Sequence, residues 1–516
     1  MPLASPYFPV PPSDAPTASP EGVVSDLAED GASFLKTLPG GLLATIAGLA
    51  LLGFLTANGA LTAASLLALG AFIVLLWRPG EPPVLLFAVG YQWAQVTAKV
   101  FHADVFGVPI EMISTSQTSI RMATWLALIG LVVLSIGIRL GLRKLPPQGK
   151  RLGLGVADFS IGRAFWLYAA AAVFSSVVLA FAWSIGSLTQ ILLGVVDLKW
   201  SAFFILAYLV FQRREGYLFF ATAFGIELVQ GVGYFSDFKT VFFVTLLAAF
   251  ATRVRLSFGT ILSGAAVLFL LLMMGSAWTV VKPEFRSAIS ADTGAQSTGE
   301  SQGEMVSRLG GMLLSLTSAD LVEGLHPFFQ RVAYTDFFAL TIDYVPAYKP
   351  YGRGELWGTA IKHVLQPRIL FPDKPRLLSD SEVTMAHTGQ YLASDAEGTS
   401  ISIGYMGEAY ADFGPVGMFG VVLLVGLGWG LIYAHFVRRA KVPLIGLSFA
   451  LALLLSAYIF EIASIKLVGG VGMKFLVLAL VYRFVEPRAA EWLRDGAPDE
   501  EAEAVGTDYV AQAGAR

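Results

Sequence analysis

The chain has 516 residues, of which 55% are hydrophobic and 14% are charged, and its mean hydropathy is +0.66. Because soluble chains carry about 25% charged residues, this composition excludes an ordinary soluble enzyme and indicates a polytopic membrane protein. The formal charge of −3 argues against nucleic acid as a partner, and the absence of cysteine excludes thiolate, disulfide and cysteine–zinc chemistry.

Two polar tails flank the apolar part of the chain. Residues 1–40 are rich in Pro, Ser, Ala and Asp and lack the pattern of a cleaved signal, so we expect a disordered cytoplasmic tail. Residues 487–516 contain an acidic stretch that we expect to be a second cytoplasmic tail. Between the tails, apolar runs predict about twelve transmembrane helices. The runs cover residues 41–57, 60–77, 83–101, 121–140, 163–184, 190–212, 217–235, 240–252, 258–281, 413–436, 443–463 and 467–485.

Lys and Arg residues in the short loops predict the orientation of these helices, since cytoplasmic loops are enriched in both. One set of alternate loops is basic, at residues 78, 139–163, 213–214, 253–255, 438–441 and 483–488, and the opposite set carries few cations. We therefore expect the basic loops and both termini to lie in the cytoplasm.

This topology leaves one long segment, residues 282–411, outside the cytoplasm. Helix-like stretches at 305–325 and 326–345 predict that it folds into a cap, because a structureless loop of this length is uncommon. The expected organisation is helices 1–9 in 41–281, the cap with the candidate active site in 282–411, and helices 10–12 in 412–486. The fold class is thus an all-α polytopic integral membrane protein with one large extracytoplasmic loop domain.

Charge is segregated within the cap. Residues 349–376 have a balance of +4, whereas every charged residue in 377–412 is acidic. The basic side chains are Lys349, Arg353, Lys362, Arg368, Lys374 and Arg376. Because arginine forks fit phosphate oxygens, one interpretation is an anion site beside a carboxylate-bearing segment. The other is a solvated face with ordinary surface ion pairs.

The five histidines do not form a metal-binding motif, so we expect no metal site. His363 and His387 flank the basic segment, which makes them candidates for a general base. A lone histidine is more often an ordinary polar side chain that is hydrogen bonded within the fold, which is the alternative interpretation of each.

Ionisable residues at membrane depth are a second source of candidates. Lys239 lies at the predicted outer mouth of a helix, where it could face a lipid-linked phosphate or pair locally with Asp237. Glu227 and Glu461 would suit a proton or ion path in a transporter, although neither has a series of polar partners along its helix.

Three stretches of the chain carry a resemblance to a known family. They are YGRGELWGTAIKHVLQPRILFPDKP at residues 351–375, TSISIGYMGEAYADFGPVG at 399–417, and HPFFQRVAY, which contains Arg331. These stretches resemble the large periplasmic loop of Wzy-type oligosaccharide repeat-unit polymerases, and the resemblance covers roughly Tyr234 to Gly417. The family is similar in fold to O-antigen ligases, which implies a GT-C-like bundle in a bacterial inner membrane.

The resemblance implies which cations hold the pyrophosphate of an undecaprenyl-linked glycan. Arg331, Arg368 and Lys374 stand at the family's cationic positions, and Lys239 stands at the corresponding helix mouth. Arg353 and Arg376, from the same basic segment, complete the predicted binding set.

A general base is also implied, and its identity stays open. Glu408 matches the acidic position just before the chain re-enters the membrane, and no histidine matches a catalytic position uniquely. The candidates are therefore Glu408, His387 and His363.

The function we expect is polymerisation of undecaprenyl-pyrophosphate-linked oligosaccharide units at the periplasmic face, for exopolysaccharide or O-antigen synthesis. Such a transfer needs cations and a base, requires no metal or other cofactor, and inverts the anomeric centre. Membrane lipids, a chain-length regulator and a flippase are the further partners that this implies. The alternatives are an O-antigen-type ligase and a transporter or flippase of lipid-linked sugars or polysaccharide.

Overall fold

The computed structural model describes most of the chain between the two tails. The described residues are 40–78, 81–143, 145, 156–182, 184, 189–232, 239–252, 258–289, 301–366, 371, 373, 377–392, 400–456 and 458–494. Among them every regular element is a helix, with one isolated bridge between Phe159 and Arg494. The chain divides into Met1–Thr45 and Ile46–Arg516, and apart from the start of the helix at Gly40 the features below belong to the second unit. Residues 1–39 of the tail predicted at 1–40, and residues 495–516, lie outside the described residues.

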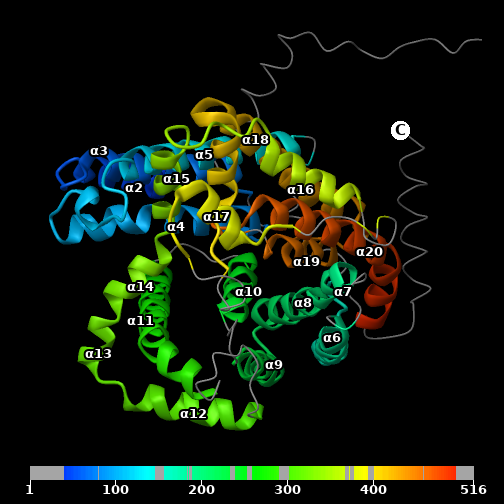
Figure 1. Cartoon of the computed structure of the whole chain (residues 1–516). Helices are drawn as coiled ribbons and strands as arrows, with labels where there is room; N and C mark the ends of the chain where they lie inside the picture. The colour runs from blue at the N-terminus through cyan, green and yellow to red at the C-terminus, as the bar shows by residue number, and fades with distance from the viewer. Residues whose placement is uncertain are drawn as a thin grey trace, which may run out of the picture. The chain divides into compact units, whose positions relative to one another are not determined.

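The helices of the first half follow the predicted apolar runs (Figure 1). They are α2 (Gly40–Gly53), α3 (Gly59–Leu76), α4 (Val84–Val105), the 3₁₀ turn η1 (Ile110–Ile113), α5 (Ile120–Leu142), α6 (Ile161–Ala182), α7 (Thr189–Val196), α8 (Leu198–Arg213), α9 (Tyr217–Gln230), α10 (Lys239–Ala251) and α11 (Phe258–Ile289). The sixth predicted run is divided at Asp197 into α7 and α8. α11 continues two turns beyond the predicted membrane boundary at residue 281.

The predicted cap is helical where its sequence suggested helices. Its elements are α12 (Gln302–Ser315), α13 (Ser318–Glu323), α14 (Leu325–Val332), α15 (Thr335–Tyr344), α16 (Glu355–Leu365) and α17 (Asp380–Thr388). The chain then forms α18 (Gly404–Arg439), α19 (Pro443–Leu454), the π-helical turn η3 (Lys466–Val471) and α20 (Gly472–Leu493). α18 begins before the predicted span at 413 and is interrupted at Gly414, whose φ of 72° is left-handed.

Six of the described helical segments are long and apolar enough to cross a membrane. They are Gly59–Leu76, Ile120–Leu142, Ile161–Ala182, Ile191–Arg213, Gly404–Arg439 and Lys466–Leu493. Four other apolar helices, α2, α9, α10 and α19, have 12–14 residues. At 1.5 Å per residue they are shorter than the hydrocarbon core of about 30 Å. The all-α membrane architecture agrees with the prediction, and the count of twelve spans stays a prediction.

Among the described helices, α5 and α18 share the most extensive contact and lie against each other through glycines (Figure 1). A Cβ atom on Gly137 of α5 would come within 2.3 Å of the Leu423 carbonyl oxygen, and one on Gly426 of α18 within 2.2 Å of the Leu134 carbonyl oxygen. Gly141 and Gly430 repeat this contact one turn further along their helices. Each helix thus has glycines four residues apart, a spacing that lets membrane helices approach closely.

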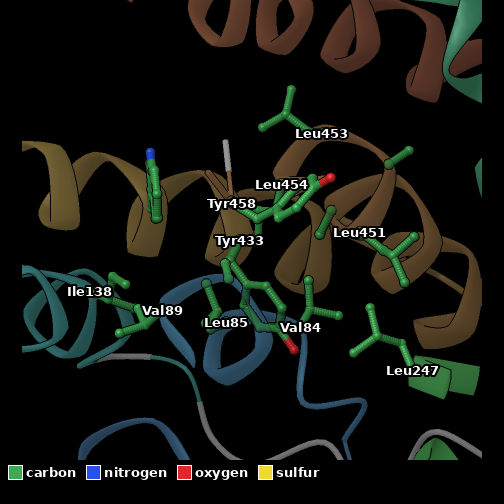
Figure 2. Packing of buried hydrophobic residues seen from close by; sticks show 14 of the residues in the cluster. Val84, Leu85, Val89, Ile138, Leu247, Tyr433, Leu451, Leu453, Leu454 and Tyr458 are labelled. Atoms are coloured by element: carbon green, nitrogen blue, oxygen red, sulfur yellow. The ribbon is translucent and has the colours of Figure 1, made fainter. Parts of the chain in front are cut away.

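A large buried core joins the N-terminal and C-terminal helices. Figure 2 shows part of it, in which Val84 and Leu85 of α4, Leu247 of α10, and Leu451 and Leu454 of α19 belong to one hydrophobic cluster. A second, smaller cluster lies between α11 and α12, and α14 packs on both α11 and α4. α14 therefore connects the helices of the cap to the main bundle.

The predicted run 443–463 is helical only as far as Leu454, and the described residues from Leu455 to Ile465 do not form a long helix. Two backbone N–H groups of this unwound segment are satisfied by side chains of other helices. Phe460 N donates to Gln95 Oε1 of α4 at 2.7 Å, and Ser464 N donates to Glu408 Oε2 of α18 at 2.9 Å. Non-helical backbone at membrane depth requires such protein partners, because lipid offers none.

Candidate functional site

Four basic side chains from three helices form a cation cluster beside the unwound segment. Lys239 begins α10, Lys282 and Arg286 are one turn apart on α11, and Arg331 lies in the last turn of α14. Burial, followed by the positive charges of the other three members, lowers the pKa of the Lys282 ammonium to about 8. Lys282 lies in the part of α11 beyond the predicted span. Within the described residues, neither Lys282 nor Arg331 has a carboxylate partner.

Arg331 shares this electrostatic environment. Desolvation against the neighbouring helices and the charge of Arg286 lower the pKa of the Arg331 guanidinium, although part of its side chain remains exposed to solvent. Arginine remains protonated even so. The cluster therefore concentrates positive charge at a place where an anion would relieve the mutual repulsion.

A cluster of four aromatic rings lies against Lys239, one of these cations. Phe87 and Tyr91 of α4, Phe243 of α10 and Tyr458 of the unwound segment all contact one another, and Tyr91 and Tyr458 are closest, with ring centroids 4.7 Å apart. Lys239 Nζ lies 5.7 Å from the centroid of Tyr458, within cation–π range. These rings fix the unwound segment against α4 and α10, and so hold it next to Lys239.

A carboxylate follows three residues after Tyr458 in the same segment. The half-buried Glu461 accepts a hydrogen bond through Oε2 from Gln95 Nε2 at 2.5 Å. Gln95 O also accepts a hydrogen bond from Tyr334 N at 3.2 Å, which ties the segment between α14 and α15 to the same point. Burial and then the charge of Glu461 raise the pKa of Tyr334, so its hydroxyl stays protonated. Glu461 is thus a carboxylate that is hydrogen bonded to Gln95, acts through its charge on the Tyr334 phenol, and follows Tyr458, the contact of Lys239, by three residues.

Glu408, a predicted base, has a different environment. Its side chain is only 4% exposed, and its Oε2 accepts the Ser464 N–H that holds the unwound segment against α18. Gly404, one turn earlier, allows the same close approach, since a Cβ there would lie 2.7 Å from the Phe460 carbonyl oxygen. These contacts give Glu408 a structural role in fixing the segment that carries Glu461.

His387 lies in another neighbourhood, at the end of α17. Its Nδ1 is 2.8 Å from the Val383 carbonyl oxygen and its Nε2 is 2.9 Å from Lys349 Nζ. Nδ1 therefore carries the proton, and Nε2 accepts from the ammonium. Burial is the largest cause that lowers the pKa of His387, and the Lys349 charge adds to it. His387 is a neutral imidazole whose basic nitrogen is already engaged by Lys349.

Arg353 belongs to the same neighbourhood. It lies in the turn Tyr351–Gly354 with a φ of 52°, and its N–H donates to the Asp412 carbonyl oxygen at 2.8 Å. The Asp412 carboxylate accepts the N–H groups of Leu356 and Trp357 at 3.2 and 3.0 Å, which fastens the start of α16 to α18. His363 lies in the last turn of α16, beyond this anchored end.

The structure thus places the predicted site residues in separate neighbourhoods, with Glu408 against Ser464 and His363 at the end of α16. Lys239 and Arg331 lie together in the cation cluster, whereas Arg353 and His387 surround the kink of α18, and none of the charges that act on His387 belongs to the cation cluster. Arg368, Lys374 and Arg376, with their part of the basic segment, lie outside the described residues.

Sequence reasoning missed Lys282, Arg286 and Gln95 as members of the site. The signal for the first two is the spacing of four residues just beyond an apolar span, which places both on one face of a continuing helix. For Gln95, the signal is an amide within a long apolar run, since a buried amide at membrane depth needs partners.

Glu227, which we considered as part of an ion path, is paired locally. Lys199 Nζ lies 2.6 Å from its Oε2, and the Tyr168 hydroxyl donates to its Oε1 at 2.9 Å. Asp237, the other proposed partner of Lys239, lies outside the described residues. The pairing of Glu227 joins α6, α8 and α9 and gives this carboxylate a structural explanation.

Comparison of the chain with protein-family models, with curated proteins and with solved structures finds no match. The case for a function therefore depends on the geometry of the cation cluster and the unwound segment, together with the resemblance of the cap sequence.

Proposed function

We propose that the protein is an inner-membrane glycosyltransferase that joins undecaprenyl-pyrophosphate-linked oligosaccharide units at the periplasmic face, with both termini in the cytoplasm. The observation that carries this proposal is the cation cluster of Lys239, Lys282, Arg286 and Arg331. Its members come from three helices, and Lys239 contacts Tyr458, which precedes Glu461 by three residues on non-helical backbone. A pyrophosphate ester is an anion whose oxygens these side chains can bind.

The cations assist departure of the leaving group. When the bond between the anomeric carbon and the pyrophosphate oxygen breaks, negative charge develops on undecaprenyl pyrophosphate. Fixed positive charges placed where this charge develops stabilise the transition state more than the ground state. The partial burial of Lys282 strengthens its interaction with the leaving group, because fewer water molecules screen it.

The acceptor sugar must lose a hydroxyl proton as it attacks. Glu461 is the described carboxylate best placed for this step, since it is half-buried and follows Tyr458, the contact of Lys239. Its hydrogen bond from Gln95 fixes one oxygen and leaves the other to accept the proton. Attack opposite to the leaving group inverts the anomeric configuration.

Deletion of the gene in its host, followed by complementation, tests the proposal. The deletion strain should accumulate single lipid-linked repeat units on the periplasmic face and lose surface polymer, and the wild-type gene should restore the polymer. Arg331→Ala should fail to restore it while the protein is present at normal level. Arg308→Ala changes an exposed arginine of α12 outside the cation cluster and should complement fully.

Other outcomes of the deletion would replace the proposal. Long lipid-linked polymer that is not transferred to an acceptor would assign the protein as a ligase. Units that remain on the cytoplasmic face would assign it as a flippase. Full activity of Arg331→Ala would remove the cation cluster from the mechanism.

A further inference from the structure

The proposed function leaves a group of three tyrosines unexplained, two of them exposed and one half-buried. Tyr344, at the end of α15, and Tyr348 are stacked, with ring centroids 5.4 Å apart and an interplanar angle of 27°. The ring of Tyr344 also covers Gly389, where a Cβ would come within 2.7 Å of it, and Tyr391 follows two residues later. Tyr348 is 79% exposed and Tyr391 is 89% exposed. We call Tyr344, Tyr348 and Tyr391 the tyrosine platform.

The platform is held in place by its backbone. Tyr348 N and Lys349 N both donate to the Tyr344 carbonyl oxygen, at 2.8 and 3.3 Å, so the turn presents the two rings in a fixed relation. Gly389 ends α17 with a left-handed φ of 66° and lies against the Tyr344 ring, and Tyr391 is two residues further along the chain. Exposed rings that are already ordered lose little conformational entropy when a ligand covers them.

Hydrogen-bonding groups border the rings. Lys349 follows Tyr348 directly, and its ammonium contacts His387 Nε2 at 2.9 Å, which leaves further N–H donors on the ammonium. The tyrosine hydroxyls add donors and acceptors at the ring edges. Flat apolar faces combined with peripheral donors and acceptors match a pyranose, which has C–H groups on one face and hydroxyls around its rim.

One short helix, α15, connects the tyrosine platform to the proposed site. α15 begins directly after Tyr334, whose phenol feels the charge of Glu461, and ends at Tyr344. Its ten residues span about 15 Å at 1.5 Å per residue. The platform is therefore about one short helix away from the carboxylate, a separation that an oligosaccharide of a few sugar rings can bridge.

We propose that the tyrosine platform binds the saccharide part of the lipid-linked glycan, several sugar units away from the bond that is formed. This proposal rests on the proposed function, since it takes Glu461 to mark the reacting end. The platform holds the chain between successive transfers, so its loss reduces glycan affinity and shortens the polymer while single transfers continue.

Binding to full-length protein in nanodiscs tests this inference without requiring turnover. The probe is the glycan released by mild acid from the host's lipid-linked pool and labelled with a fluorophore at its reducing end. Tyr348→Ala and Tyr391→Ala should each weaken binding about fivefold to tenfold, as loss of one aromatic contact predicts. Tyr348→Trp, which keeps an aromatic face, should bind with near wild-type affinity. Tyr217→Ala removes an exposed tyrosine of α9 and is the matched control.

The outcomes separate this inference from the proposed function. Two results would show that the platform does not bind the glycan. One is wild-type affinity in both alanine variants, which is also expected if the tyrosines only anchor the protein at the membrane surface. The other is no binding of the probe by wild-type protein at millimolar concentration. If wild-type protein joins lipid-linked units and the alanine variants give polymer of unchanged length, the platform fails and the polymerase stands. If the probe binds through the platform but lipid-linked units are never joined, the polymerase fails.

Discussion

The charge of Lys282 makes anion binding by the cation cluster sensitive to pH. Because burial and three neighbouring cations lower its pKa to about 8, the ammonium loses its proton as pH rises through this value. Deprotonation removes one positive charge from the free protein, so kcat/KM for the lipid-linked donor should fall between about pH 7 and 9. Lys282→Arg keeps the charge over this range and should move the decline to higher pH. A pH profile of kcat/KM measures the difference, with Lys362→Arg on α16 as control. Superimposable profiles of wild type and Lys282→Arg would contradict the assignment.

Substitution by glutamine shows whether Glu461 or Glu408 is the general base. Glu461→Gln preserves shape and can still accept from Gln95, but it removes the base, so kcat should fall about 10²-fold to 10⁴-fold with normal expression and melting temperature. Glu408→Gln retains an oxygen for Ser464 N and should lower kcat less than about tenfold. Single-turnover transfer of a lipid-linked unit gives both rates. The reverse order of effects would make Glu408 the base.

At the scale of elements, the position of α16 depends on Asp412. This carboxylate is 2% exposed and accepts two N–H groups of the first turn of α16, which have no other partner within the helix. Asp412→Ala should therefore lower the free energy of unfolding by about 1–2 kcal/mol. Asp412→Asn, which keeps one acceptor oxygen, should cost less. Thermal unfolding in detergent measures both, and Glu355→Ala, an exposed acidic residue of the same turn, should be near wild type. An unchanged melting temperature for Asp412→Ala would show that α16 is held elsewhere.

The contact between α5 and α18 offers a matched pair of glycines on one helix. A Cβ on Gly426 would lie 2.2 Å from the Leu134 carbonyl oxygen, whereas one on Gly428 meets nothing within 4 Å. Gly426→Ala should force the two helices apart and destabilise the protein by about 1–3 kcal/mol. Gly428→Ala should be neutral or slightly stabilising, because alanine favours the helix. The two melting temperatures test this directly. Equal values would mean that α5 and α18 are not closely packed in the membrane.

For the whole molecule, the apolar runs were sufficient to locate the helices, because a continuous apolar run of this length has few other structures available in lipid. They could not locate the interruption after Leu454. The unwound backbone is satisfied by Gln95 and Glu408, which accept from Phe460 N and Ser464 N, and no local pattern contains these contacts. For the site, the resemblance named Lys239 and Arg331, which the structure brings into one cluster. Lys282 and Arg286 join them only because α11 continues beyond the predicted span.

The side of the membrane on which the cation cluster lies decides whether it can meet a periplasmic lipid-linked donor. The cysteine-free sequence permits a direct test, since one introduced thiol is the only one in the chain. Leu314→Cys places it at an 89% exposed position in the predicted cap, and Glu215→Cys places it in the turn between α8 and α9, which we expect in the cytoplasm. In spheroplasts, a membrane-impermeant maleimide should label the first variant, and the second only after permeabilisation. The opposite pattern would invert the orientation. It would then place the cluster on the cytoplasmic face, where only donors that have not yet crossed the membrane are available.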